Sequence, residues 1–202
     1  MTPSSAPPIT RRSSPTQRRT AALDAFIDLV LEQGGHPRPE DVAARAGVSI
    51  ASLYRYFESL EELRRDAVAR LVERFPELFA IPRLGTGPRT ARIDTFVDTR
   101  FALHEELHTL QLLSRAASRS DEDAVVIVDT ARAFFADQVR SQFARELASL
   151  GPAERDDTVA AIAALTSVES WEQFRRSHAR SPRQTRRAWA RSIDRLLPEE
   201  TI

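Results

Sequence analysis

The chain contains 202 residues, with 29 basic and 29 acidic side chains, so its formal charge is zero. Every basic residue is arginine, and cysteine is absent, which excludes a disulfide scaffold, a Cys-ligated zinc site and a thiol nucleophile. The first apolar pair of any length is at Leu23, after a Pro/Ser/Arg tract with no hydrophobic core, which argues against a secretory signal. No apolar run reaches the roughly 18 residues of a membrane span. These features favour a cytoplasmic protein without membrane contact.

Glycine and proline fall in clusters that separate long stretches containing neither residue. Those stretches are 16–33, 48–75, 89–150 and 153–181. They are rich in Ala, Leu, Arg and Glu and are too long for strands, so they predict an all-α fold. The longest is most polar at 118–123, where we expect one helix to end and another to begin with Ser120 as its N-cap.

The apolar spacing agrees with helices. Apolar residues between Leu23 and Leu31 recur on one helical face, and the helix should end at Gly34–Gly35. Ser59 and Glu62 form a capping box before another apolar stripe. Near the C-terminus, the spacing predicts helices at about 153–179 and 183–197.

The segment 39–57 has the pattern of two short helices joined by a tight turn. Pro39 suits the first turn of a helix, Gly47 can end it in the left-handed conformation, and Ser49 can cap the next helix. In that second helix, we expect Ile50, Leu53 and Phe57 to point inward. The pattern predicts a helix-turn-helix, whose second helix enters the major groove of DNA.

The outward residues of the second helix have side chains suited to DNA. They are Ala51, Ser52, Tyr54, Arg55 and Tyr56. Hydroxyl groups can bond phosphate oxygens, arginine can fork onto guanine, and alanine permits close approach to a base edge. Between residues 42 and 57 there are two arginines, Arg45 and Arg55, and no acid. An amphipathic helical hairpin without DNA-binding activity is the alternative from spacing alone.

Here the residues match a family. The runs Ala43–Ser49 and Leu53–Phe57, followed by Leu63, resemble the DNA-binding signature of TetR-type (TetR/AcrR) transcriptional regulators. Leu60 departs from the family pattern, in which a lysine aimed at a phosphate is usual. The resemblance covers about residues 18–65. It implies a homodimer that binds an inverted-repeat operator in double-stranded DNA, and a helical C-terminal domain that binds a small-molecule effector.

We therefore interpret 1–15 as a disordered basic arm, 16–80 as the DNA-binding domain with a connecting helix, and 81–202 as the ligand-binding and dimerisation domain. The expected protein is a repressor with no enzymatic activity and no cofactor. Its predicted DNA contacts are Arg18, Arg19, Arg45, Ser49, Ala51, Ser52, Tyr54, Arg55 and Tyr56. Of these, Arg19, Ser49 and Tyr56 should hold phosphates, whereas Ser52, Tyr54 and Arg55 should face bases.

A zinc-dependent hydrolase is an alternative, because residues 104–108 read HExxH. On a helix, His104 and His108 would share one face, with Glu105 beside them as general base. No third ligand follows at a recognisable spacing, so we expect no metal and no catalytic residue. A helical interaction module that does not bind DNA is the other alternative.

Aromatic residues of the C-terminal part suggest an apolar or aromatic effector. The candidate ligand-binding residues are Phe101, His104, His108, Phe134, Phe135 and Trp171. The candidate dimer-interface residues, on the last two helices, are Ala160, Ala164, Trp171, Phe174, Trp189 and Ile193. Eight arginines crowd residues 175–195, and we interpret them as solvated cations whose stems cover apolar helix surface.

Overall fold

The computed structural model describes residues 14–119 and 122–199. Within these ranges the chain is helical and has no strand, which confirms the all-α prediction. Residues 1–13 of the predicted arm (1–15) and the proposed N-cap Ser120 lie outside the described residues, whereas Ser14 and Pro15 belong to the start of the first helix.

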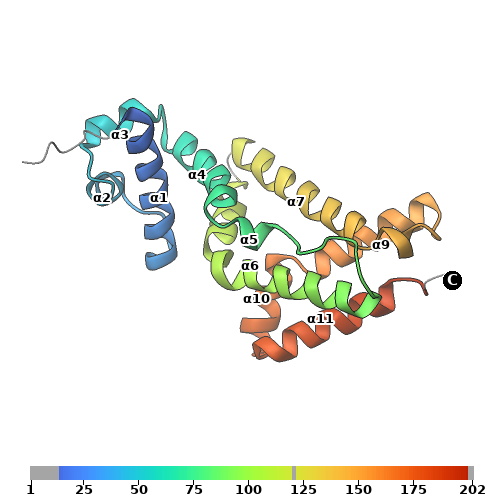
Figure 1. Cartoon of the computed structure of the whole chain (residues 1–202). Coiled ribbons are helices and arrows are strands. Elements are labelled where there is room, and N and C mark those ends of the chain that lie inside the picture. The colour runs from blue at the N-terminus through green and yellow to red at the C-terminus, as the bar shows by residue number, and fades with distance from the viewer. Residues whose placement is uncertain (1–13, 120–121, 200–202) are drawn as a thin grey trace, which may run out of the picture.

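Three helices form a compact unit at one end of the molecule, which we call the head (Figure 1). They are α1 (Pro15–Gln33), α2 (Pro39–Arg45) and α3 (Ile50–Tyr56). Helix α1 begins with a capping box between Ser14 and Gln17 and ends at Gly34, which has a φ of 73°. Gly47 separates α2 from α3 with a φ of 68°, a conformation that glycine adopts without steric cost.

The connecting helix α4 (Leu60–Arg74) leads from the head to the larger part of the molecule, which we call the body. The capping residue of α4 is Ser59, whose side chain accepts a hydrogen bond from the Glu62 backbone. A short helix α5 (Pro76–Phe79), which the sequence did not predict, follows α4. Pro76 explains the interruption, because its ring cannot continue a helix from the preceding turn.

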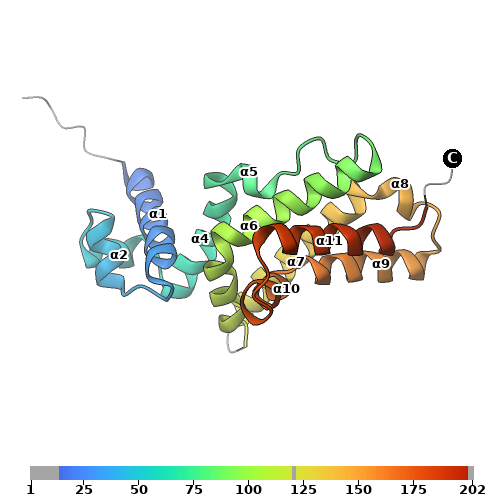
Figure 2. The same ribbon diagram turned by 90° about the horizontal axis from the view of Figure 1, so that it is seen from below.

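The body consists of α6 to α11. Their bounds are α6 (Arg89–Ala117), α7 (Glu122–Gln142), α8 (Ala144–Leu147), α9 (Pro152–Leu165), α10 (Val168–Glu172), a π-helical turn (Gln173–Ser177) and α11 (Pro182–Leu196). The break between α6 and α7 falls within the polar segment where we expected it. The helix predicted at 153–179 is instead divided, because Thr166 ends α9 and Ser167 caps α10. Figure 2 shows α9 and α11 side by side in the body, consistent with the contacts between them.

Two apolar cores stabilise these parts. The first joins the head to α4 and also includes Leu103, Leu107 and Leu110 of α6. The second lies in the body between α6, α7, α9 and α11, and Trp189 is completely buried in it. Because α6 contributes to both cores, a displacement of this helix would be felt in the head and in the body.

Candidate functional site: a DNA-binding surface and a cavity

The exposed face of α3 carries the hydroxyl and guanidinium groups predicted to contact DNA. Ser49 caps the helix by accepting a hydrogen bond from the Ser52 backbone, and the two serine hydroxyl oxygens are 3.0 Å apart. The Arg55 guanidinium lies 3.4 Å from the Ser52 hydroxyl. Ala51 is exposed, and Tyr54 is 51% exposed. The serines, Arg55 and Tyr54 thus form a polar strip along one short helix.

Tyr56 lies at the end of this strip and is flanked by cations. A hydrogen bond donated by Arg55 lowers the pKa of the Tyr56 hydroxyl, burial opposes the shift, and Arg18 of α1 adds to the lowering. The Arg55 guanidinium also lies 5.4 Å from the centre of the Tyr56 ring. A hydroxyl between two guanidinium groups is a favourable place for an anion such as a DNA phosphate.

Two arginines predicted to contact DNA have partners inside the protein. Arg45 forks onto Glu32, with nitrogen–oxygen distances of 2.9 and 2.7 Å. Arg19 donates a hydrogen bond to Asp66 of α4, and its guanidinium lies 4.8 Å from the centre of the Phe57 ring. Arg19 therefore ties α1 to α4, and both arginines are less available to phosphate than the sequence suggested.

The expected inward direction of Ile50 is wrong. Ile50 is 39% exposed, whereas Leu53 and Phe57 are 1% and 2% exposed. The first turn of α3 extends beyond the apolar core, so its leading residue remains accessible to solvent. An exposed aliphatic side chain at this position adds apolar surface beside the polar strip.

A large cavity of about 1000 Å³ lies in the body beside α4. Its walls come from α4, α6 and α7, and the segment joining α9 to α10 closes one side. The lining is largely apolar and includes Val68 and Val72 of α4. Val72, Val126 and Phe134 are among the exposed large apolar side chains, so the cavity has an apolar rim. Cavities of this kind bind small molecules.

The structure brings half of the predicted ligand-binding residues to the cavity. His104, Phe134 and Phe135 line it. Phe101 instead packs in the body core, with its ring centre 6.2 Å from that of Trp189. His108 and Trp171 pack against each other outside the cavity, with ring centres 4.6 Å apart. The sequence analysis missed Arg100, a buried cation of the cavity wall.

The two histidines and the glutamate of the HExxH pattern each have partners inside the protein, which argues against a zinc-dependent hydrolase. The ring nitrogens of His104 lie 2.7 Å from the Gln111 side chain and 2.9 Å from the Thr166 carbonyl oxygen. Glu105 accepts hydrogen bonds from Trp171 and Arg175. His108 contacts the carbonyl of His104 and Arg176. Among residues 14–119 and 122–199, no three histidine or acidic residues gather as a metal site would require.

Some of the residues predicted for a dimer interface lie on the surface of the body, and others are buried in its core. Ala160 and Ala164 are exposed on α9, and Phe174 is half-buried. Trp171, Trp189 and Ile193 are buried in the body core of a single chain, so these three assignments are wrong. Trp189 and Ile193 lie on α11 and Trp171 lies on α10, and both helices pack against α6. A side chain enclosed in this way cannot meet a second protomer.

The described helices also bear on membrane contact. Over the two described ranges, none combines the length and apolar character that crossing a membrane requires.

Comparisons with known proteins connect the head to a family. Residues 30–67 match the model of "Bacterial regulatory proteins, tetR family". This stretch spans the end of α1, all of α2 and α3, and half of α4. A search of curated proteins found no match.

Solved structures extend the similarity to the whole described fold. A tetR-family transcriptional regulator from Streptomyces coelicolor has 19% identity and a TM-score of 0.72, over 90% of this chain and 80% of its own. A transcriptional regulator from Rhodococcus sp. Rha1 has 17% identity and a TM-score of 0.63, over 91% and 96% of the chains. The multidrug binding protein EbrR, solved with imidazole, has 18% identity and a TM-score of 0.59, over 91% and 97%.

At these identities the solved structures establish a shared fold, and the matched segment shows that the head is similar to the tetR family. Members of this family are DNA-binding transcription factors rather than enzymes. The helix-turn-helix of the head, with its match at residues 30–67, and the all-helical body are thus similar to those of transcriptional regulators of the tetR family.

Proposed function

We propose that the protein is a homodimeric repressor that binds an inverted-repeat operator through α3 and is released by a small apolar or aromatic effector. The observation that carries the DNA-binding part is the strip formed by Ser52, Tyr54, Arg55 and Tyr56 on α3. Arg55 and Tyr54 contact bases, whereas Tyr56, Ser49 and Arg18 hold phosphates. Access to the genome requires a cytoplasmic location.

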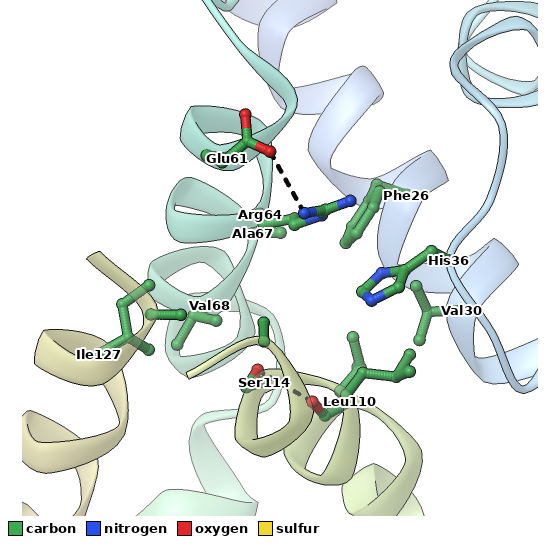
Figure 3. Close-up of a pocket in the computed structure, with 13 residues that line it drawn as sticks. Phe26, Val30, His36, Glu61, Arg64, Ala67, Val68, Leu110, Ser114 and Ile127 are labelled. Atoms are coloured by element: carbon green, nitrogen blue, oxygen red, sulfur yellow. Dashed lines mark hydrogen bonds and ion pairs between the residues drawn. The ribbon is translucent and has the colours of Figure 1, made fainter. Parts of the chain in front are cut away.

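The effector occupies the cavity in the body and acts on the head through α4. A smaller pocket, of about 40 Å³, lies where the head meets α4, α6 and α7. Figure 3 shows the residues that line it. Val68, Leu110, Ser114 and Ile127 line both this junction and the large cavity. An effector that displaces these shared walls changes the packing beneath α1. Effector and DNA then weaken each other's binding by linkage.

Dimerisation uses the exposed surface of α9 and α11. Ala160, Ala161 and Ala164 are exposed on α9, where their small side chains permit close approach of a second helix. Arg183, Arg187 and Arg191 are exposed on α11, and the acids Glu154 and Asp157 are exposed near the start of α9. Opposite charges on the two neighbouring helices support an isologous contact between copies. Two heads related in this way would meet successive major grooves about 34 Å apart.

The test is DNA binding to the region upstream of the protein's own gene, measured by fluorescence anisotropy over a range of salt concentrations. Affinity should fall steeply as salt rises, because arginines that hold phosphates displace bound cations from DNA. Tyr56→Phe should reduce affinity for every sequence. An affinity that does not change with salt concentration, or a Tyr56→Phe variant with the same DNA affinity as the parent, would favour a helical module that does not act on DNA.

A further inference from the structure

The cavity in the body contains a buried cation for which the described residues supply no counter-ion. Arg100 of α6 is 4% exposed and lies in the cavity wall. Its Nη2 atom donates a hydrogen bond to the Gln138 side chain at 2.8 Å. Among the described residues, no carboxylate lies within ion-pair distance of its guanidinium group. A neutral amide is thus its hydrogen-bonding partner.

Two aromatic rings hold the guanidinium in place. Its central carbon lies 4.0 Å from the centre of the Phe135 ring and 5.3 Å from that of Phe96. Gln138 is itself fixed, because its amide nitrogen donates to the Phe79 carbonyl at 2.6 Å. The rings and the amide orient the group without neutralising its charge, and burial lowers the pKa of Arg100 to about 9. It therefore remains a cation at neutral pH.

The other nitrogens of Arg100 are accessible from the cavity. Among the described residues, the fully buried side-chain nitrogens that lack a hydrogen-bond partner are Arg186 Nε and Trp189 Nε1. No nitrogen of Arg100 is in this group, so its unbonded nitrogens are not fully enclosed by protein. Because Arg100 lines the cavity and has one bonded nitrogen, its remaining N–H groups can meet a ligand there. An uncompensated buried charge is costly, so a ligand that pairs with it gains more than one that does not.

The charges around the cavity also favour an anion. Glu169 is the acidic residue in the lining, and its carboxylate is 2.5 Å from Arg115. Arg132 also lines the cavity, where it pairs with Asp129 at 3.1 Å. Both of these arginines have carboxylate partners, and Arg65, the remaining arginine of the lining, is exposed. Arg100 is therefore the buried cation of the lining that a ligand would neutralise.

We propose that the effector is an apolar or aromatic molecule with one acidic group, and that the Arg100 guanidinium binds this group inside the cavity. The inference rests on the proposed function, because it requires the cavity to be the effector site. A carboxylate suits the arginine best, since two parallel N–H groups can meet its two oxygens. The apolar walls on α4 and α7 would hold the rest of the molecule.

The test uses two fluorescent probes that differ by one acidic group, 8-anilinonaphthalene-1-sulfonate and the neutral N-phenyl-1-naphthylamine. Both are titrated into the full-length protein and into Arg100→Gln. We expect the substitution to weaken sulfonate binding by roughly 10- to 100-fold, the range for a hydrogen bond to a charged group, and to change neutral-probe binding less than about 2-fold. Retained neutral binding shows that the variant is folded.

Two further variants localise the effect. Arg140→Gln removes a cation of α7 that has a carboxylate partner, Asp137, and lies outside the cavity lining, so it should leave both titrations unchanged. Ala131→Trp fills the cavity from α7 and should weaken both probes. Equal effects of Arg100→Gln on the two probes, or undiminished binding to Ala131→Trp, would overturn the proposal. If the parent protein bound neither probe, the effector cavity of the proposed function would itself be contradicted.

Discussion

Arg45 and Glu32 form a two-pronged ion pair on the surface of the head, with nitrogen–oxygen distances of 2.9 and 2.7 Å. The pair joins the end of α2 to the last turn of α1. The pKa of the Glu32 carboxyl is lowered, chiefly by its hydrogen bonds from Arg45. The Glu32 carboxylate, beside the proposed DNA-binding surface, repels phosphate. It also pairs with Arg45, a cation that could otherwise bind phosphate.

Glu32→Gln should therefore strengthen DNA binding, roughly 2- to 10-fold at low salt, because it removes a negative charge and releases Arg45. Arg45→Gln should weaken it. Fluorescence anisotropy with operator DNA gives both affinities. The matched control is Asp129→Asn, which opens an exposed arginine–carboxylate pair in the body and should have no effect. Weaker binding by Glu32→Gln would mean that the pair is needed to position α2.

Arg55 should contribute to base preference as well as affinity. Arg55→Ala should lower operator affinity by about 1–3 kcal/mol and should reduce the difference between operator and unrelated DNA. Competition binding with single-base operator variants measures both effects. Arg180→Ala, in the arginine-rich segment before α11, is the control, since that arginine is exposed in the body and lies outside the proposed dimer surface. If Arg180→Ala produced the larger loss, the arginine-rich C-terminal segment would be the nucleic-acid surface instead.

Local signals explain why the head was predictable from sequence. Gly47 has the positive φ expected at the turn, and Ser49 and Ser59 cap the helices that they were expected to begin. Each signal depends on neighbours within a few residues. The partners of Arg19 and Arg45 could not be read in this way, because Asp66 lies 47 residues away and Glu32 lies 13 residues away.

The body was less predictable because an apolar row does not reveal what it faces. Trp189 and Ile193 pack against their own chain, although the same spacing would suit a contact with a second protomer. Arg100 left a weak signal: it is a charged residue in the row that includes Phe96, Leu103 and Leu107, all of which are buried. A cation within an apolar stripe indicates a special environment, but the cavity beside it requires α4 and α7 to be placed.

His104 should make the protein less stable in acid. Burial is the main cause that lowers the pKa of His104 to about 4, against an ordinary value of 6.5. The neutral ring is therefore the form that the fold favours. The stability that the neutral ring contributes is fully present above pH 6.5 and is lost as the pH falls toward 4. The loss at pH 5 is about 2 kcal/mol of the free energy of unfolding.

The variant His104→Gln should remove this component of the pH dependence. Urea unfolding at pH 8 and pH 5 gives the difference in the free energy of unfolding for each protein. The parent should lose about 2 kcal/mol more than the variant between these pH values. His178→Gln, which alters an exposed histidine, should behave like the parent. Equal losses for parent and His104→Gln would show that the ring is not held neutral by the fold.

Arg92 and Glu146 form a buried ion pair that should be a strong determinant of stability. Their nitrogen–oxygen distances are 2.8 and 2.6 Å, and both side chains are fully buried. Burial acts against the charged form of Glu146, but hydrogen bonds from Arg92 outweigh it and lower the pKa of the carboxyl. Arg92 also donates to the carbonyls of Gly87 and Gln142. The pair thus joins α6, α7 and α8 with the loop before α6.

Glu146→Gln should reduce the free energy of unfolding by about 3–5 kcal/mol, because it removes the carboxylate that pairs with the buried Arg92 guanidinium. Replacing both residues, as Arg92→Met with Glu146→Leu, should recover at least half of that loss, since no uncompensated charge remains. Urea unfolding of the single and double variants measures the coupling. If the double variant were as unstable as the sum of the two single changes, the hydrogen bonds from Arg92 to backbone carbonyls would matter more than its charge pairing.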